Sequence, residues 1–295
     1  MKVAIYGQFY DKNSGAYIQD LLRALKENRI EAVVEEQFLH LIKENEKISQ
    51  EFTGLSTFTQ LDNSFDLFFS IGGDGTILRS VTYIRDLDIP IVGINAGRLG
   101  FLATVQKDEI DATIACILNR EYTLSRRSLL SFDTSDEIPM DINFALNEIA
   151  VSRKNTTAMI TIEVWLNGEY LNAYWADGLI VATPTGSTGY SLSCGGPVMA
   201  PDVQNFVITP IAPHNLNARP LVINDTTEIK LKISGREDSY LLSMDSRTAT
   251  LKSERTITLK KAPFKINLAQ LNNDSFIKTI RKKLLWGEDK RNLQQ

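Results

Sequence analysis

The sequence predicts an α/β amino-terminal domain with a mostly parallel sheet, followed by a β-rich, β-sandwich-like carboxy-terminal domain. Over about the first 120 residues, short apolar runs alternate with apolar residues at helical spacing, which is the pattern of βαβ units. From about Leu124 onwards the helical spacing fades, and strand-like runs joined by turn residues replace it. The chain has 295 residues, of which 43% are apolar, so it can bury the core of one large domain or two medium ones.

The amino-terminal pattern begins with a strand at Lys2 to Gly7. After Ser14, a residue type that caps helices, apolar residues recur at helical spacing. A second strand is expected at Ala32 to Glu35. The residues that predict the intervening helix are Tyr17, Leu21, Leu22 and Leu25.

The next part of the chain reads as one βαβ unit. The apolar runs FDLFFSI (Phe65 to Ile71) and IPIVGI (Ile89 to Ile94) flank a helical pattern from Thr76 to Ile84. Because a helix separates the two strands, we expect them to pair in parallel.

The second half of the chain reads as strands and hairpins, including an Asn-Gly turn at Asn167 and Gly168. At the end, Phe276 to Trp286 is apolar on one side and basic on the other, which predicts a helix. Its basic face can bind an anion, or its lysines can simply be solvated beside a packed apolar stripe. We expect an α/β domain at residues 1–124, rejoined by a helix at 270–290, and a β-rich domain at 125–269. The further strands are expected at Gly178 to Ala182, Thr226 to Ile233, Ser239 to Met244 and Thr256 to Lys260.

Charge and cysteine content exclude several classes of protein. The net charge of -4 provides no basic field for nucleic acid or an anionic membrane. Cys116 and Cys194 are too few and too far apart for a disulfide framework or a zinc site, which favours a reducing compartment. No leader and no membrane-spanning apolar run is visible, so we expect a cytoplasmic protein.

The most informative short motif follows the strand Phe65 to Ile71. Glycines at the end of a parallel strand let backbone amides approach a ligand, and the helix that follows favours phosphate at its N-terminus. Asp74 would be repelled by phosphates unless it holds a cation or accepts a proton, so it is the candidate catalytic base. The alternative is a tight turn in which Asp74 caps the helix. The motif consists of Gly72, Gly73, Asp74, Gly75 and Thr76.

A second glycine-rich element, Asn95 to Leu102 (NAGRLGFL), follows the next strand. Asn and Gly at a strand end suit the floor of a ligand crevice at the carboxyl edge of the sheet, although they equally suit a structural turn. Arg79, one turn into the preceding helix, can reach a phosphate or can be an exposed helical arginine.

The longest motif runs from Ala176 to Pro197 and is dense in hydroxyls and glycines. Tyr190 within it suits stacking on a flat base, so the composition indicates a nucleotide-binding loop, with a solvated connection as the alternative. Asn147 and Glu148 interrupt the apolar stretch FALNEIAV, and such polar residues require specific partners or an edge position.

These motifs together resemble the NAD kinase family, over about residues 66 to 220. GGDGT alone is shared with diacylglycerol and sphingosine kinases, whereas Thr-Gly-Ser-Thr-Gly-Tyr-Ser, at residues 185–191, is far more particular to NAD kinases. The resemblance implies transfer of the γ-phosphate of ATP to the 2′-hydroxyl of the adenosine ribose of NAD, in a homodimer or homotetramer. Mg²⁺ bridging the ATP phosphates would neutralise charge, and no protein metal ligands are expected.

The resemblance also implies roles for individual residues. Asp74 would take the proton of the 2′-hydroxyl, and its loop would meet the ATP phosphates. Asn147 and Glu148 would contact the adenosine portion of NAD, and Asp177 would lie near the nicotinamide side. Ala212 would touch nucleotide beside His214, for which a structural or binding role is favoured, and His40 is expected at the surface. The residues expected to surround adenine or line its loop are Thr185, Thr188, Gly189, Tyr190, Ser191, Leu192 and Ser193.

The sequence departs from the family pattern at three places. Gly189 stands for the usual Ala and Cys194 for a small residue. The expected Asp-Gly-Gln turn appears as Asp245-Ser246-Arg247, where the guanidinium of Arg247 can favour a phosphate or carboxamide oxygen of NAD. Two alternatives remain, namely a lipid kinase of the diacylglycerol kinase type and a protein that senses NAD(P) without turnover.

Overall fold

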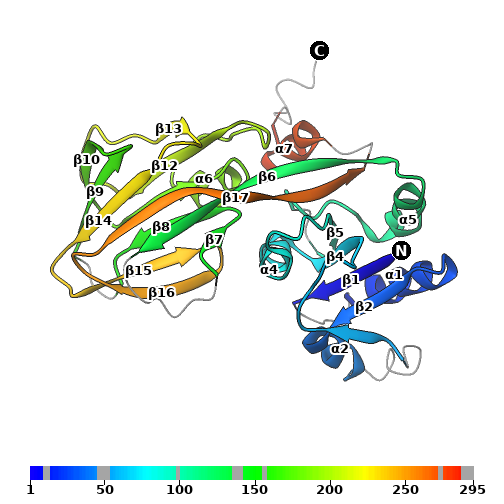
Figure 1. The fold of residues 1–295 in the computed structure, drawn as a ribbon. Helices are drawn as coiled ribbons and strands as arrows, with labels where there is room; N and C mark the ends of the chain where they lie inside the picture. Colours follow the sequence, from blue (N-terminus) through cyan, green and yellow to red (C-terminus); the bar gives the residue numbers. More distant parts are fainter. Residues whose placement is uncertain are drawn as a thin grey trace, which may run out of the picture. The chain divides into compact units, whose positions relative to one another are not determined.

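The computed structural model describes residues 1–8, 14–44, 54–97, 100–134, 142–154, 158–271 and 275–286. The chain divides into two compact units, Met1–Arg126 with Ile266–Gln295 (unit 1) and Arg127–Lys265 (unit 2). The sequence prediction placed the corresponding divisions after residues 124 and 269. The strands β6 (Tyr122–Thr134) and β17 (Thr256–Leu271) each contribute residues to both units (Figure 1).

Unit 1 is an α/β unit built on a parallel sheet in the order β5-β4-β1-β2-β3, with the end of β17 pairing in parallel beside β5. The predicted strand at Lys2 to Gly7 is present with those bounds, and the predicted βαβ unit is confirmed because β4 and β5 pair in parallel. The elements of unit 1 are β1 (Lys2–Gly7), α1 (Ser14–Glu27), β2 (Glu31–Glu35), α2 (Glu36–Lys43), β3 (Ser56–Phe58), β4 (Leu67–Gly72), α4 (Asp74–Ile84), β5 (Ile91–Asn95), η1 (Lys107–Glu109), α5 (Ile110–Leu118) and α7 (Phe276–Leu284).

Helices cover both faces of this sheet, which explains why its strands are continuously apolar. Residues of α1 and α5 pack with Val3, Ile5 and Phe69 in one core cluster, and the two helices lie against each other (Figure 1). On the opposite face, Ser80 of α4 donates to Ser70 of β4 at 3.0 Å. A fully buried Leu or Ile in such a layer contributes about 1.5–3 kcal/mol relative to an exposed one.

Unit 2 consists of two antiparallel sheets, which confirms the β-rich prediction. One sheet has the order β13-β12-β11-β8-β15-β16, and the other contains β10, β9, β14 and the first part of β17, with β6 and β7 beside it. The further elements are β7 (Phe144–Ala145), β8 (Glu148–Ser152), β9 (Ile160–Leu166), β10 (Glu169–Ala176), β11 (Gly178–Ala182), η2 (Gly186–Thr188), α6 (Tyr190–Ser193), β12 (Asn205–Ile211), β13 (Leu221–Asn224), β14 (Ile229–Ser234), β15 (Ser239–Met244) and β16 (Arg247–Lys252).

The core of unit 2 lies between these sheets (Figure 1). Val151 and Leu242 of one sheet and Ile162 and Leu231 of the other belong to one buried cluster, so the unit is sandwich-like, as expected. The predicted Asn-Gly turn is also confirmed, because positive φ angles at Asn167 and Gly168 (51° and 84°) join β9 to β10.

The terminal helix prediction at Phe276 to Trp286 is confirmed as α7, which ends two residues earlier, at Leu284, because Leu285 adopts a left-handed conformation. Ser275 caps its start by accepting the N–H of Lys278 at 3.1 Å. Among the helices in the described ranges, none combines the length and the apolar character needed to cross a membrane.

Candidate active site

The GGDGT motif lies at the carboxyl end of β4 and leads directly into α4. The helix begins at Asp74, two residues earlier than the sequence predicts, with Gly73 as its N-cap. No side chain caps this helix end, and Gly73 and Gly75 are both exposed. Its first backbone N–H groups therefore suit an anion.

The carboxylate of Asp74 accepts three successive backbone N–H groups, two from the end of the second glycine-rich element and one from the residue that follows it. Oδ2 accepts from Phe101 at 2.7 Å, and Oδ1 accepts from Leu102 at 2.9 Å and Ala103 at 3.1 Å. The alternative that Asp74 caps the helix is therefore wrong, because its oxygens bind a segment 27 to 29 residues further along the chain. These bonds join the two predicted motifs into one site.

Glycine at position 100 is required for this arrangement. A Cβ on Gly100 would overlap the carboxylate of Asp74, so any larger residue would displace that side chain. Gly72 has a φ of +150°, and a Cβ there would overlap the hydroxyl of Thr76. The two glycines thus bring Asp74 and the 101–103 amides together.

Asn95 lies beside the motif at the carboxyl edge of the sheet, since it pairs with Gly72 in the β4–β5 ladder. Its side chain is fully buried, and its Oδ1 accepts the N–H of Gly97 at 2.8 Å. Its Nδ2 has no hydrogen-bond partner in the described part of the chain, which leaves a buried donor for a ligand. Arg79 is exposed on α4, and Arg98 and Leu99 of the predicted element lie outside the described residues.

In unit 2 the Asn-Glu pair and the hydroxyl-rich loop form a second site. Thr183 donates its N–H to the carbonyl of Asn147 at 2.9 Å and its hydroxyl to that of Leu146 at 2.6 Å. A Cβ on Gly186 would overlap the backbone of Asn147, and one on Gly189 would lie 3.0 Å from Oε2 of Glu148. Small residues in the loop therefore allow it to pack directly on the pair.

Asn147 and Glu148 both carry oxygens that lack partners. Oδ1 of Asn147 and Oε2 of Glu148 are shut off from solvent and accept no hydrogen bond from the described residues. Burial first, and the nearby charge of Asp245 second, raise the pKa of Glu148 to about 8, while the N–H of Tyr190 acts in the opposite direction. Leaving such groups unsatisfied costs about 1–3 kcal/mol each, so they point to a ligand.

The loop residues predicted to surround adenine divide into two groups. Tyr190 and Ser193 are exposed, and Thr188, Gly189 and Leu192 are half-buried. Thr185 and Ser191 are buried instead, with their hydroxyls bonded to Arg127 at 3.4 Å and Thr209 at 2.8 Å. The exposed aromatic ring of Tyr190 is the surface on which a base can stack.

Other predicted residues already have protein partners. The carboxylate of Asp177 forms a fork with Arg153, both N–O distances being 3.1 Å. Ala212 is exposed and has a φ of 43°, a left-handed conformation that is uncommon for alanine. The ring of His214 lies 4.5 Å from that of Trp175, consistent with a structural or binding role, and His40 is exposed as predicted.

The Asp245–Arg247 turn contains a feature that sequence analysis missed. Asp245 accepts the backbone N–H groups of Leu146, Asn147 and Glu148 at 2.9, 2.7 and 3.2 Å. Arg247 donates to the carbonyls of Ile142 and Phe144 rather than projecting freely. The only hint in the sequence was the polar turn itself, because these partners lie about 100 residues earlier.

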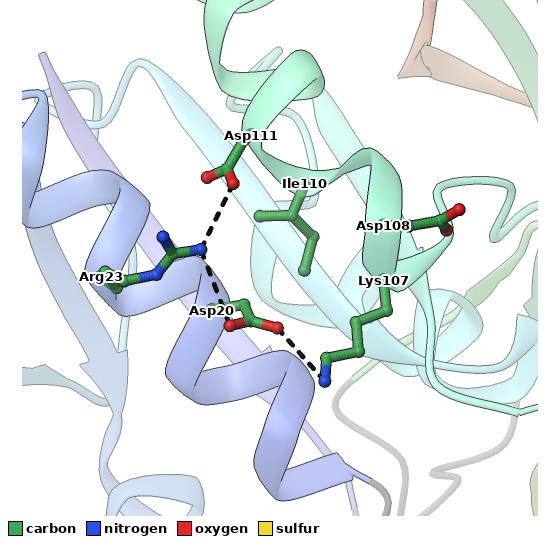
Figure 2. Close-up of a pocket in the computed structure, with 6 residues that line it drawn as sticks. All are labelled: Asp20, Arg23, Lys107, Asp108, Ile110 and Asp111. Atoms are coloured by element: carbon green, nitrogen blue, oxygen red, sulfur yellow. Dashed lines mark hydrogen bonds and ion pairs between the residues drawn. The ribbon is translucent and has the colours of Figure 1, made fainter.

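One surface cavity lies elsewhere in unit 1, between α1 and α5 (Figure 2). Arg23 pairs with Asp20 and Asp111, and Lys107 pairs with Asp20, so both cations are matched by carboxylates. None of the predicted site residues lines this cavity. Within the described ranges, no group of three or more His, Cys, Asp or Glu side chains is arranged to hold a metal ion.

Comparison with known families decides among the alternatives. Residues 3–122 match the model of the ATP-NAD kinase N-terminal domain, and residues 146–271 match that of the ATP-NAD kinase C-terminal domain. The chain belongs to the NAD kinase family. NAD kinases are phosphotransferases, so the comparisons support an enzyme and give no support to a lipid kinase or a non-catalytic sensor.

Curated NAD kinases match over nearly the whole chain. The NAD kinase of Christiangramia forsetii is 62% identical and that of Flavobacterium psychrophilum 57% identical, each covering 99% of this chain and 100% of the relative. An NAD kinase from Archaeoglobus fulgidus, solved in complex with ATP, has a TM-score of 0.74 and 26% identity, covering 97% of this chain and 99% of that chain. Yeast NADH kinase, complexed with NADH, has a TM-score of 0.85, covering 97% and 88%, and at 24% identity shows the fold alone.

Proposed function

We propose that this chain transfers the γ-phosphate of ATP to the 2′-hydroxyl of the adenosine ribose of NAD, giving NADP and ADP. The observation that carries the proposal is the fixed carboxylate of Asp74 beside the uncapped start of α4. Phosphoryl transfer needs a positioned acceptor and stabilised phosphates more than a covalent nucleophile. Both requirements can be met at this end of the sheet.

Asp74 is proposed as the general base. A carboxylate has about four lone-pair positions, of which Oδ1 uses two and Oδ2 uses one on backbone N–H groups. Oδ2 therefore retains a position for the proton of the 2′-hydroxyl, whose oxygen forms the new bond to the γ-phosphorus as the bond to ADP breaks. The three N–H donors also fix the carboxylate in one orientation.

The donor phosphates are proposed to bind at the start of α4, with Asn95 and Arg79 as additional donors. Gly72, Gly73, Gly75 and Thr76 supply the close backbone approach. Mg²⁺ is proposed to arrive as part of the substrate, held by the ATP phosphates, and it would neutralise their charge.

The NAD adenosine is proposed to bind in residues 125–269, at Asn147 and Glu148, whose buried oxygens lack partners. Tyr190 would stack on adenine, with Thr188, Gly189, Leu192 and Ser193 around it. Asp177 would lie near the nicotinamide side, together with the guanidinium of Arg153 that it binds. Ala212 would touch the nucleotide. Thr185 and Ser191 would support this loop from within. We further propose that the protein is cytoplasmic, since ATP and NAD are cytoplasmic metabolites, and that it is a homo-oligomer, as the family resemblance implies.

The test is an assay of NADP formation from NAD, ATP and Mg²⁺ with the purified chain. Asp74→Asn removes the base and also places an NH₂ group against at least one of the three backbone N–H donors, so we expect kcat to fall about 10²- to 10⁴-fold. Binding of NAD should stay measurable, because the adenosine residues are unchanged.

The matched control is Asp111→Asn, at an exposed residue on α5, which should retain full activity. A wild-type chain that forms no NADP would overturn the proposed function. An Asp74→Asn variant that keeps the wild-type rate would overturn the role of Asp74 alone.

A further inference from the structure

The turn between β15 and β16 lies directly beside the start of β8. Asp245 is the first residue of this two-residue turn and has a φ of 51°, which aspartate tolerates better than most residues. Its own N–H donates to the carbonyl of Glu148 at 3.0 Å, and Met244 pairs with Ile149. The turn is thus fixed at the point where the Asn147–Glu148 pair enters the sheet.

The carboxylate of Asp245 holds the N–H groups of this segment. Its Oδ1 accepts from Asn147 and Glu148 and its Oδ2 from Leu146, at distances of 2.7 to 3.2 Å. The side chain is only 2% exposed. This single side chain satisfies all three N–H groups of residues 146–148, whereas Thr183 binds the carbonyl groups of Leu146 and Asn147.

The guanidinium of Arg247 holds the carbonyl groups just before them. It donates to the carbonyl oxygen of Ile142 at 3.4 Å and to that of Phe144, and it lies 3.7 Å from Oδ2 of Asp245. The planar guanidinium presents its donors in a rigid fork, which suits two carbonyl groups that are two residues apart in the chain. The two charged side chains thus bind one backbone segment, residues 142–148. Arg247 binds carbonyl groups in its first part, and Asp245 binds N–H groups in its last part.

This segment carries the side chains on which NAD binding would depend. The unpartnered oxygens of Asn147 and Glu148 can meet donors on a ligand only if their backbone is held in one conformation. We propose that Asp245 and Arg247 act as positioning residues for NAD, setting its affinity through residues 142–148 without touching it. This inference rests on the proposed function, because it takes Asn147 and Glu148 as adenosine contacts.

The decisive variant is Asp245→Asn. Asparagine has the same shape but only one acceptor oxygen, so its NH₂ group must face a backbone N–H in either orientation. We expect the KM and the Kd for NAD to rise about tenfold or more, as the loss of one charge-assisted bond implies. The KM for ATP should stay within about twofold, because the GGDGT loop is unchanged.

The matched control is Asp225→Asn. Asp225 is another aspartate of unit 2 whose side chain is 2% exposed, and it pairs with Lys261 rather than with residues 142–148. Its loss should lower the melting temperature while leaving both KM values unchanged. Arg247→Gln, which keeps a polar side chain but loses the guanidinium fork, should raise the KM for NAD less than Asp245→Asn does. Arg247→Lys should not restore it, because an ammonium group lacks the fork.

The outcomes separate this inference from the proposed function. A wild-type chain that neither binds NAD nor forms NADP overturns both. A wild-type chain that does so, with Asp245→Asn indistinguishable from Asp225→Asn in its KM and Kd for NAD, overturns the positioning role alone. If Asp245→Asn does not fold, Arg247→Gln tests the positioning role instead. An unchanged KM for NAD in Arg247→Gln would then overturn that role.

Discussion

Two aspartates, one in each unit, each accept three successive backbone N–H groups, but their side chains differ in exposure. Asp74 accepts the N–H groups of residues 101–103, and Asp245 accepts those of residues 146–148. Asp74 is half-buried, and Gly100 leaves room for its carboxylate. The side chain of Asp245 is 2% exposed and has Arg247 beside it.

The comparison shows that hydrogen bonding alone does not distinguish a reacting carboxylate from one that only positions its neighbours. Three N–H donors orient both side chains. Access decides, because a substrate hydroxyl must come within hydrogen-bond distance of a base, and only Asp74 combines a free lone pair with exposure. The buried Asp245 can act only through the segment that it holds.

The largest further effect is expected from Gly100→Ala, which would move Asp74 without removing it. The new Cβ would overlap the carboxylate, so Asp74 must leave the 101–103 amides. Since a displacement of about 1 Å can cost about 10²-fold in rate, we expect kcat to fall about 10- to 100-fold with little change in NAD binding. Steady-state kinetics and NAD titration would measure this.

The matched control for that change is Gly235→Ala, where the nearest atom to a new Cβ is a side-chain methyl of Ile160 at 3.3 Å. It should retain the wild-type kcat. Equal activity of the two variants would contradict the requirement for glycine at position 100.

A smaller effect is expected on the dependence of stability on pH, through the burial of Glu148 and, second, the nearby charge of Asp245. The pKa of Glu148 rises from 4.5 to about 8 in the folded protein, so the folded state binds its proton more tightly than the unfolded state. Stability from this group is therefore full below about pH 4.5 and is lost as the pH rises to about 8. Burial also raises the pKa of Asp245, although its N–H donors and Arg247 lower it. Asp245 therefore changes stability with pH in the same direction as Glu148.

Thermal melting between pH 5 and pH 8.5 would test this dependence, about the window set by the Glu148 pKa. The melting temperature of the wild-type chain should fall with pH more steeply than that of Glu148→Gln, which cannot ionise. Glu254→Gln, at an exposed surface pair with Lys232, serves as the control and should follow the wild-type curve. Parallel curves for wild type and Glu148→Gln would show that this carboxyl is not responsible.

The smallest effect on stability is expected for Asp111, an aspartate that pairs with an exposed arginine side chain. Asp111 pairs with Arg23 at 3.3 Å, and both side chains are more than half exposed (Figure 2). Asp111→Asn should change the free energy of unfolding by less than about 1 kcal/mol, measured by urea denaturation. If Asp111→Asn lost as much free energy of unfolding as Asp245→Asn, a carboxylate that accepts backbone N–H groups would stabilise this protein no more than an exposed ion pair does.

Much of the fold followed from local sequence. The strand Lys2–Gly7, the helix after GGDGT and the hairpin at Asn167–Gly168 were predicted from apolar spacing and turn residues, which act between near neighbours in the chain. The motifs also indicated the family, because GGDGT and the 185–191 segment are short continuous runs. The start of α4 was misplaced, since Asp74 reads as a cap until its real partners are known.

The sequence by itself therefore determined the fold class, the order of the motifs and Asp74 as the candidate base. Only the tertiary structure decided which backbone amides Asp74 binds, why position 100 must be glycine, and that Asp245 and Arg247 hold residues 142–148. The physical reason is separation along the chain. Periodicity and turn chemistry depend on adjacent residues, whereas the partner of a carboxylate depends on which distant segments folding brings within about 3 Å.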